Sequence, residues 1–196
     1  MRMIAVILAA IMAGATALAQ QSVPPPPQPA PDKPAVNGPS LEATMKFIQD
    51  KLNEIGTINF AGYVHDSSNN SDGVQKFSAT FSNVVANPGA CSLSYHRLII
   101  NNGQTEHNEN VFINLRDVQS IAVLPDEQDW QMYLVRSGDT TKTVKDVPEI
   151  SALVIKLTNG KDPTIRFYEQ ELADRVAKAM VHAVELCGGG PKPEPF

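Results

Sequence analysis

The stretch at residues 171–188, ELADRVAKAMVHAVELCG, has the clearest periodicity in this 196-residue chain. Its apolar side chains recur at intervals of three and four residues, which places them on one face of an α-helix, and its charged side chains fall on the opposite face. Gly188 follows where glycine commonly ends a helix. A helix of this kind must cover an apolar surface, which the rest of the domain has to supply. The apolar face consists of Leu172, Val176, Met180, Ala183, Val184 and Cys187.

A second amphipathic helix is expected at residues 41–55. Ser40 is a favourable N-cap, Glu42 lies in the first turn, where the helix dipole favours an acid, and Gly56 follows the last turn. Charged side chains keep to the other face, so we expect this helix to lie on the surface of the domain. The shared apolar face consists of Leu41, Met45, Ile48, Leu52 and Ile55.

Between the two helices the apolar period changes from 3.6 to 2, which indicates β-strands. Segments rich in Asn, Asp, Gly and Ser separate them as turns, and the acidic segment 126–129 is one of these. The sequence therefore predicts an α+β fold with an N-terminal helix, a curved antiparallel β-barrel or sandwich, and a C-terminal amphipathic helix. The predicted strands occupy residues 58–65, 76–84, 91–100, 110–115, 120–124, 130–136, 152–157 and 164–168.

The N-terminus has the pattern of a secretory signal peptide. Arg2 precedes an apolar run at residues 4–13, and Ala17-Leu18-Ala19 offers small side chains to a signal peptidase. The alternative is a retained membrane anchor, which needs about 20 apolar residues, more than this run contains. We expect cleavage after Ala19 and a periplasmic or secreted mature chain.

The mature chain divides into three segments. Residues 20–38 are proline-rich and predict an extended polyproline II linker. Residues 39–188 have the length and composition of a single α+β domain. Residues 189–196 form a Gly/Pro tail that cannot continue a helix or pair as a central strand.

The two cysteines, Cys91 and Cys187, are expected to form a disulfide. An exported protein meets an oxidising environment, and an even number of cysteines favours pairing. The bond would fasten the last helix to the sheet. The alternative is two buried free thiols; a redox role is disfavoured because there is no C-x-x-C motif.

The charge balance excludes one class of partner. The chain has 16 Lys and Arg against 21 Asp and Glu, a formal net charge of -5, and no basic cluster. Nucleic-acid binders usually carry clustered basic residues, so we expect no nucleic-acid partner.

No catalytic or metal motif stands out, and we expect no cofactor. The histidines, His65, His96, His107 and His182, lack the spacing of a zinc site, and H-E-x-x-H and G-x-S-x-G are absent. We expect His96 and His182 to face solvent. The segments 68–73 and 126–129 resemble calcium-binding loops, but ordinary solvated turns are the better interpretation.

The C-terminus carries a resemblance. Leu186-Cys187-Gly188-Gly189 ends the last helix, and Glu194-Pro195-Phe196 closes the chain. This ending resembles that of uncharacterised exported bacterial proteins with an L-C-G-G and E-P-F signature, a family without an assigned activity, so the resemblance implies no catalytic residues. Phe196 either belongs to a free tail or is captured by a partner through its carboxylate.

The order of strands closed by one amphipathic helix resembles the pleckstrin-homology-like barrel, in which such a helix plugs one end. We expect a non-catalytic binding or interaction module of the bacterial cell envelope, whose partner is a protein, a peptide or a lipid. The alternative is a small secreted hydrolase without a recognisable motif. A deep pocket with converging titratable residues would favour the enzyme, and a shallow groove or exposed strand edge would favour the binding module.

Overall fold

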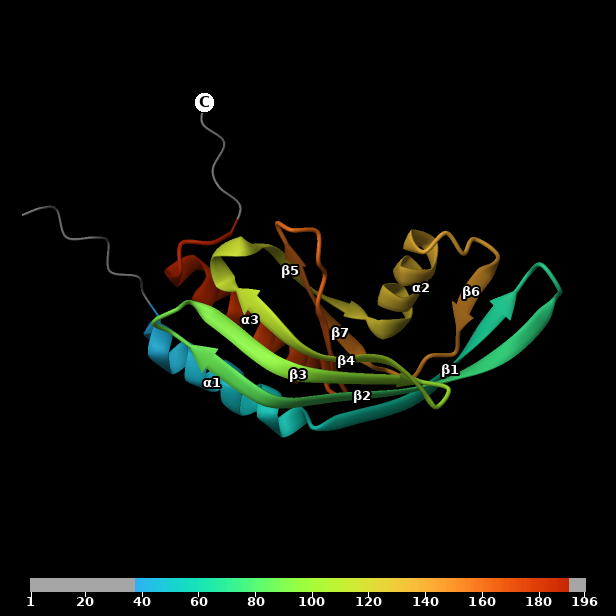
Figure 1. Ribbon diagram of the computed structural model, residues 1–196, viewed down its shortest axis with the longest axis horizontal. Coiled ribbons are helices and arrows are strands. Elements are labelled where there is room, and N and C mark those ends of the chain that lie inside the picture. Colours follow the sequence, from blue (N-terminus) through green and yellow to red (C-terminus); the bar gives the residue numbers. More distant parts are fainter. Residues whose placement is uncertain (1–37, 191–196) are drawn as a thin grey trace, which may run out of the picture. The chain divides into compact units, whose positions relative to one another are not determined.

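The computed structural model describes residues 38–190 (Figure 1). The predicted signal peptide, nearly all of the proline linker and Phe196 lie outside the described residues. Among the helices of the described part, none combines the length and apolar character that crossing a bilayer requires. The elements are α1 (Leu41–Ile55), β1 (Thr57–Asp66), β2 (Ser71–Asn87), β3 (Ser92–Asn101), β4 (Gln104–Asn114), the 3-10 helix η1 (Leu115–Asp117), β5 (Val118–Pro125), α2 (Asp126–Arg136), β6 (Lys142–Lys145), β7 (Ser151–Leu157), β8 (Thr164–Phe167) and α3 (Gln170–Leu186).

The strands form two antiparallel sheets. One has five strands in the order β4-β3-β2-β1-β6, and the other has three in the order β5-β7-β8. The predicted α+β class, with a helix at each end and antiparallel sheets between, is confirmed. The sequence left a barrel or a sandwich open; the strands do not form a closed barrel, because they are divided between two separate sheets. The likeness to the pleckstrin-homology-like barrel stays a prediction.

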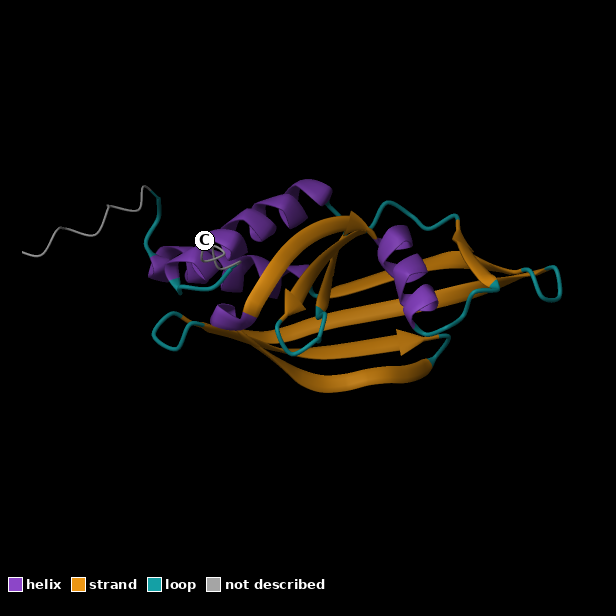
Figure 2. Ribbon diagram, turned by 90° about the horizontal axis from the view of Figure 1, so that it is seen from above, coloured by secondary structure: helices purple, strands orange, loops and turns teal. Residues whose placement is uncertain are grey.

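The smaller sheet and α2 lie over the concave side of the five-stranded sheet (Figure 1). Seen from above, α2 crosses the strands of the larger sheet, and α1 and α3 gather at the other end of the domain (Figure 2). Alternation along β1 explains this arrangement, because every second residue from Ile58 to Val64 is buried on the concave face while the residues that alternate with them are exposed.

The two long helices close the core at one end. Met45, Ile48 and Leu52 of α1 pack with Val176 and Met180 of α3 in the main apolar cluster, and each is at most 1% exposed. Burying a side chain of this size stabilises the fold by about 1.5–3 kcal/mol. The predicted apolar faces of both helices are therefore confirmed, as is the predicted N-cap, where the Ser40 hydroxyl accepts from the Ala43 amide at 3.3 Å.

The predicted disulfide is present. Cys91 precedes β3, and Cys187 ends α3, with their Cα atoms 5.8 Å apart across 96 positions. Among the glycines that follow Cys187, Gly189 is required for a steric reason. A side chain at Gly189 would clash with the carbonyl oxygen of Leu115, and the Gly190 amide donates to the Val118 carbonyl at 3.3 Å. The first residues of the predicted tail therefore pack against η1.

One predicted strand is wrong. Residues 130–136 belong to α2, because Trp130 and Leu134 are four residues apart and the helix begins with acids and ends with Arg136. The segment 126–129 is the first turn of this helix and not a solvated turn, since Asp126 is 1% exposed and Asp129 6%. The short strand β6 was not predicted, and β2 and β4 are longer than expected.

Candidate functional site

A cleft of about 440 Å³ lies between the concave face of the five-stranded sheet, α2 and β8. This volume is within the range of small-molecule sites, which are usually concave, largely apolar and equipped with a few polar groups. Its wall draws on β1 to β4, α2, β6, β8 and the loop before β8. The residues that the argument uses are Phe60, Phe77, Arg97, Asn101, Asp126, Asp129, Trp130, Arg136, Asp162 and Arg166.

Aromatic rings form the apolar side of the cleft. Phe60 and Phe77 stack with centroids 5.3 Å apart, and Trp130 meets Phe77 edge-on at 4.7 Å. Trp130 reaches the sheet because β1 has a glycine beneath it: a Cβ atom on Gly62 would lie 2.8 Å from the indole ring. Glycine at this position therefore permits α2 to sit close to the sheet.

A buried cluster of one base and two acids lies beside the aromatic rings. Arg166 of β8 donates from Nε to Asp126 Oδ1 at 2.7 Å, and its Nη2 lies 3.6 Å from Asp129 Oδ2. Asp126 and Asp129 are three residues apart on the first turn of α2, which brings both carboxylates to one side of the helix. The guanidinium also lies 5.9 Å from the centroid of Phe60, so the cluster borders the aromatic rings.

The electrostatics of the cluster are unbalanced. Burial raises the pKa of Asp126 above its usual range, and the nearby charge of Arg166 only partly opposes this effect. Burial likewise raises the pKa of Asp129 against the opposing charges of Arg166 and Arg136. When both acids are ionised, one guanidinium in direct contact faces two carboxylates, and the cluster has an excess negative charge.

The sheet supplies a second polar wall. Arg97 of β3 donates from Nη2 to Glu109, and this bond is the main reason that the pKa of Glu109 is lowered. Asn101 of β3 donates from Nδ2 to Glu106 Oε1 at 2.8 Å. Glu106 is the extra residue at an irregularity in the β3–β4 pairing, which explains why it lines the cleft beside His107.

Three buried polar atoms of the cleft residues have no hydrogen-bond partner within the described part of the chain. They are Asp126 Oδ2, Asn101 Oδ1 and Arg97 Nε, which are two acceptors and one donor. A buried polar atom without a partner costs about 1–3 kcal/mol, so such atoms are uncommon in folded proteins. All three atoms belong to residues that line the cleft, so their missing partners have to be water or a ligand in the cleft.

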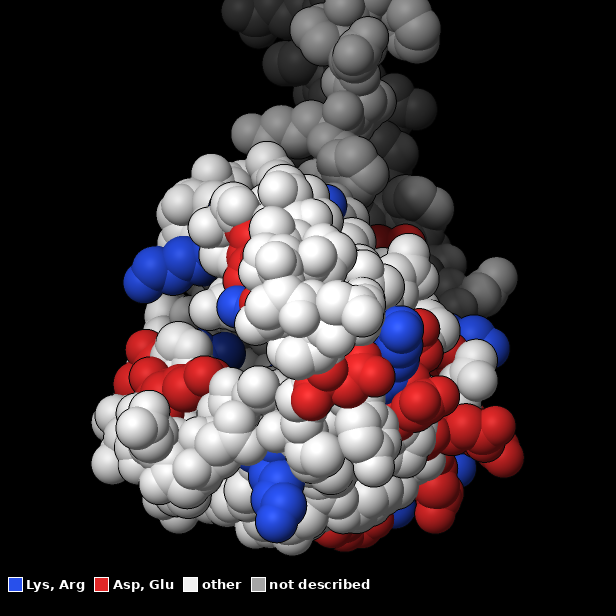
Figure 3. All heavy atoms as spheres, turned by 90° about the vertical axis from the view of Figure 1, so that its right-hand side faces the viewer, with Lys and Arg blue, Asp and Glu red and all other residues white. Residues whose placement is uncertain are grey.

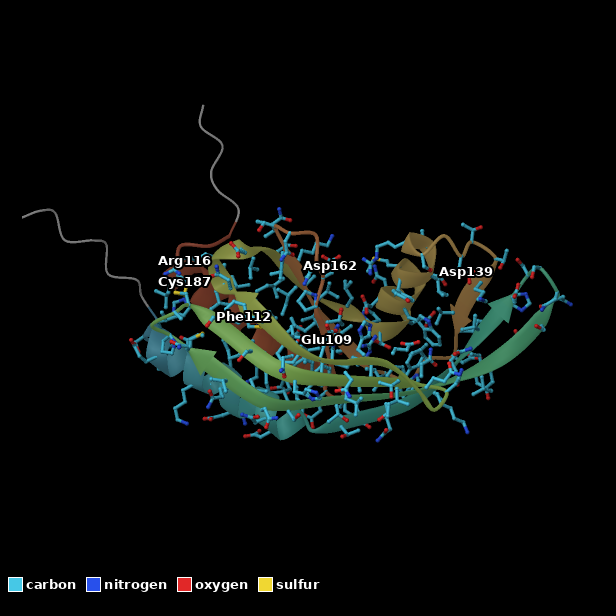
Figure 4. All side chains as sticks on the ribbon, viewed as in Figure 1. Glu109, Phe112, Arg116, Asp139, Asp162 and Cys187 are labelled. Carbon is cyan, nitrogen blue, oxygen red and sulfur yellow. A yellow bond between two sulfur atoms is a disulfide. The ribbon has the colours of Figure 1, made fainter. Side chains whose placement is uncertain are left out.

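Charged side chains of both signs surround the cleft. Arg136 at the end of α2 lies 3.6 Å from Asp162, and Lys142 of β6 lies 2.6 Å from Asp139. Figure 4 shows Asp162 projecting above the five-stranded sheet, on whose edge Glu109 lies. Seen from the end where α2 and β6 lie, acidic and basic groups are interspersed around a recess (Figure 3). The charge around the recess therefore has no single sign.

The histidines do not converge. His65 pairs with Asp72 at 2.8 Å in the β1–β2 hairpin, and His96 contacts Asn108 at 2.9 Å on the convex face. His182 is largely covered and not solvated as expected, because its Nε2 lies 2.9 Å from the Pro39 carbonyl oxygen. His107 alone lines the cleft, 3.1 Å from Glu109.

No group of metal-ligating side chains is found among residues 38–190. Neither cysteine lines the cleft. Figure 4 shows Cys187 at the end of the domain near Arg116 and Phe112, and Asp139 at the opposite end. The disulfide therefore secures the fold away from the cleft.

Sequence reasoning missed the cleft because it placed Asp126 and Asp129 in a solvated turn. The signal that would have found them is the acidic first turn after Pro125, followed by apolar residues at helical spacing. Comparison with family models, with curated proteins and with solved structures found no match to this chain. The cleft is therefore interpreted from its own geometry.

Proposed function

We propose that this chain is a non-catalytic binding module of the bacterial cell envelope that holds a small amphipathic molecule in its cleft. One observation carries the proposal: the unpartnered polar atoms of Asp126, Asn101 and Arg97 share a cleft with stacked aromatic rings. Such a site suits a ligand with an apolar body and a few polar groups. The expected partner was a protein, a peptide or a lipid. The size of the cleft limits what it can hold to a small molecule or to a small part of such a partner.

The envelope location is supported by the disulfide between Cys91 and Cys187, which is typical of oxidising compartments. The signal-peptide pattern of residues 1–19 points to the same address. A non-catalytic role is supported by the pairing inside the cleft. Arg166 holds both acids, and among the described cleft residues no hydroxyl group is hydrogen-bonded to a histidine or a carboxylate that could activate it.

A small hydrolase is the second candidate, because the cleft brings titratable groups together. A carboxyl whose pKa is raised by burial can act as a general acid near neutral pH, and Asp126 and Asp129 both have raised pKa values. The two proposals predict different outcomes. If the mature chain hydrolyses a generic ester or glycoside and Asp126→Asn loses this activity, the hydrolase proposal is supported and the non-catalytic proposal is wrong.

The binding proposal is tested with the fluorescence of Trp130, the single tryptophan of the chain, which lines the cleft. The mature protein is titrated with a set of small amphipathic compounds of positive, zero and negative charge. We expect saturable changes in emission for some of them. Phe77→Ala removes a ring of the cleft and should lower the affinity for these compounds. Phe112 of β4 is 65% exposed, so Phe112→Ala should leave the affinity unchanged.

If no compound changes the emission and native mass spectrometry detects no bound compound, the binding proposal fails. Equal weakening by Phe77→Ala and Phe112→Ala would also contradict it, because the cleft would then have no special part in binding.

A further inference from the structure

We propose that the ligand is an organic amine whose protonated nitrogen binds Asp126 Oδ2 and whose apolar body lies against Phe60, Phe77 and Trp130. This inference rests on the proposed binding function and specifies the ligand's chemical class. It follows from Asp126 Oδ2, which among the described cleft residues is the one carboxylate oxygen that is buried and has no hydrogen-bond partner.

The charge of the buried cluster favours a cation. Arg166 is occupied on Asp126 Oδ1 and is shared with Asp129, so Oδ2 of Asp126 has no donor among the described residues. The next base, Arg136, is half-exposed and already lies beside Asp162. A ligand cation at Oδ2 would balance the second carboxylate.

The remaining polar atoms agree with an ammonium group better than with a carboxylate. Two of the three unpartnered atoms are acceptors, on Asp126 and Asn101, and an ammonium group has donors only. The single unpartnered donor, Arg97 Nε, belongs to a guanidinium that is already paired with Glu109. A carboxylate ligand would also enter a cleft that contains two buried acids.

The aromatic side of the cleft suits the same ligand. Phenylalanine and tryptophan rings attract cations over their faces and also accept an apolar body. Phe60 already has the Arg166 guanidinium 5.9 Å from its centroid, and Phe77 and Trp130 extend the aromatic surface beyond it. A ligand with an ammonium group and an aromatic or branched apolar part would therefore contact both features.

The test is calorimetric titration of the mature chain with three compounds that share one body: 4-phenylbutylamine, 4-phenylbutan-1-ol and 4-phenylbutanoate. A hydrogen bond to a charged group contributes more than a neutral one, so we expect the amine to bind about ten to a hundred times more tightly than the alcohol. The acid should bind most weakly. Asp126→Asn should lower the affinity for the amine to that for the alcohol. Asp50→Asn, an exposed acid of α1, should leave all three unchanged.

The outcomes separate this inference from the proposed function. If the alcohol or the acid binds as tightly as the amine, the cleft binds ligands but the amine assignment is wrong. Unchanged amine affinity in Asp126→Asn would overturn it equally. If Asp126→Asn does not fold, the comparison of the three compounds on the native chain decides alone. If none of the three binds, and the Trp130 titrations find ligands that are not amines, the assignment fails while the binding function stands.

Discussion

Arg166→Met is the perturbation that tests the buried cluster most directly. Methionine retains the apolar stem but removes the charge that lies 2.7 Å from Asp126 and 3.6 Å from Asp129. At an effective dielectric constant of about 20, two unit charges about 4 Å apart interact by about 4 kcal/mol. Removing one partner of a buried ion pair typically destabilises by about 3–5 kcal/mol, because a buried charge loses its counterion. We expect a loss of this size in the free energy of unfolding at pH 7.

The loss should depend on pH with a defined sign. The folded-state pKa values of Asp126 and Asp129 are already above the usual aspartate value of 3.8, and without Arg166 they rise further. An acid whose pKa is raised by folding stabilises the folded state below its unfolded pKa, and this stability is lost as the pH rises through the folded pKa. The deficit of Arg166→Met should therefore be largest at neutral pH and should shrink as the pH falls toward about 4.

Urea unfolding of the native chain and the variant at several pH values measures this difference. Arg136→Met is the matched control, because Arg136 is 49% exposed and lies 3.6 Å from a single acid, Asp162. An exposed ion pair contributes about 0–1 kcal/mol, so the control should lose little. A deficit for Arg166→Met that is below about 1 kcal/mol, or that stays constant from pH 7 to pH 4, would show that the cluster is not electrostatically coupled as described.

Two further predictions concern the frame around the cleft. Replacing Cys91 and Cys187 by alanine opens a loop of 96 positions and should lower the free energy of unfolding by about 4–5 kcal/mol in the chain-entropy model, measured by urea unfolding; an unchanged midpoint would refute this. Gly62→Ala places a methyl group 2.8 Å from Trp130, so it should shift the Trp130 emission and lower the affinity for ligands of the cleft. Gly73 has open space around it, so Gly73→Ala should change neither.

The sequence predicted the features that depend on local periodicity. The apolar faces of α1 and α3, the Ser40 cap and most strands follow from spacing alone, because those patterns are set within a few residues. The disulfide was predictable for a different reason, since two cysteines in a chain with a predicted signal peptide have only one way to pair within it. The sequence could not show whether the strands close into one barrel or form two sheets, because that depends on pairings between distant segments.

The cleft could not be predicted because its wall joins many separate segments. Arg166 and Asp126 are 40 positions apart and meet only after β7 and β8 pair beside α2. The alternation of Trp130, Met132 and Leu134 fits a strand as well as a helix, and that ambiguity hid the helix that holds the acids. An atom such as Asp126 Oδ2 can be recognised as lacking a hydrogen-bond partner only when the positions of all neighbouring atoms are known.

Asp126 links the stability of the empty protein to its ligand. Because burial exceeds the effect of Arg166 and raises its pKa, the ionised form of Asp126 opposes folding at neutral pH. Asp126→Asn keeps the shape, leaves Arg166 paired with Asp129, and should therefore match or exceed the native chain in unfolding free energy at pH 7 without ligand. That advantage should shrink as the pH falls, because protonation of the native carboxyl removes the buried charge. The same variant should lose amine binding, so the acid would be a functional residue that costs stability. A less stable Asp126→Asn at pH 7, measured by urea unfolding beside the Asp50→Asn control, would show that the pair with Arg166 outweighs burial and that the cluster needs no ligand cation.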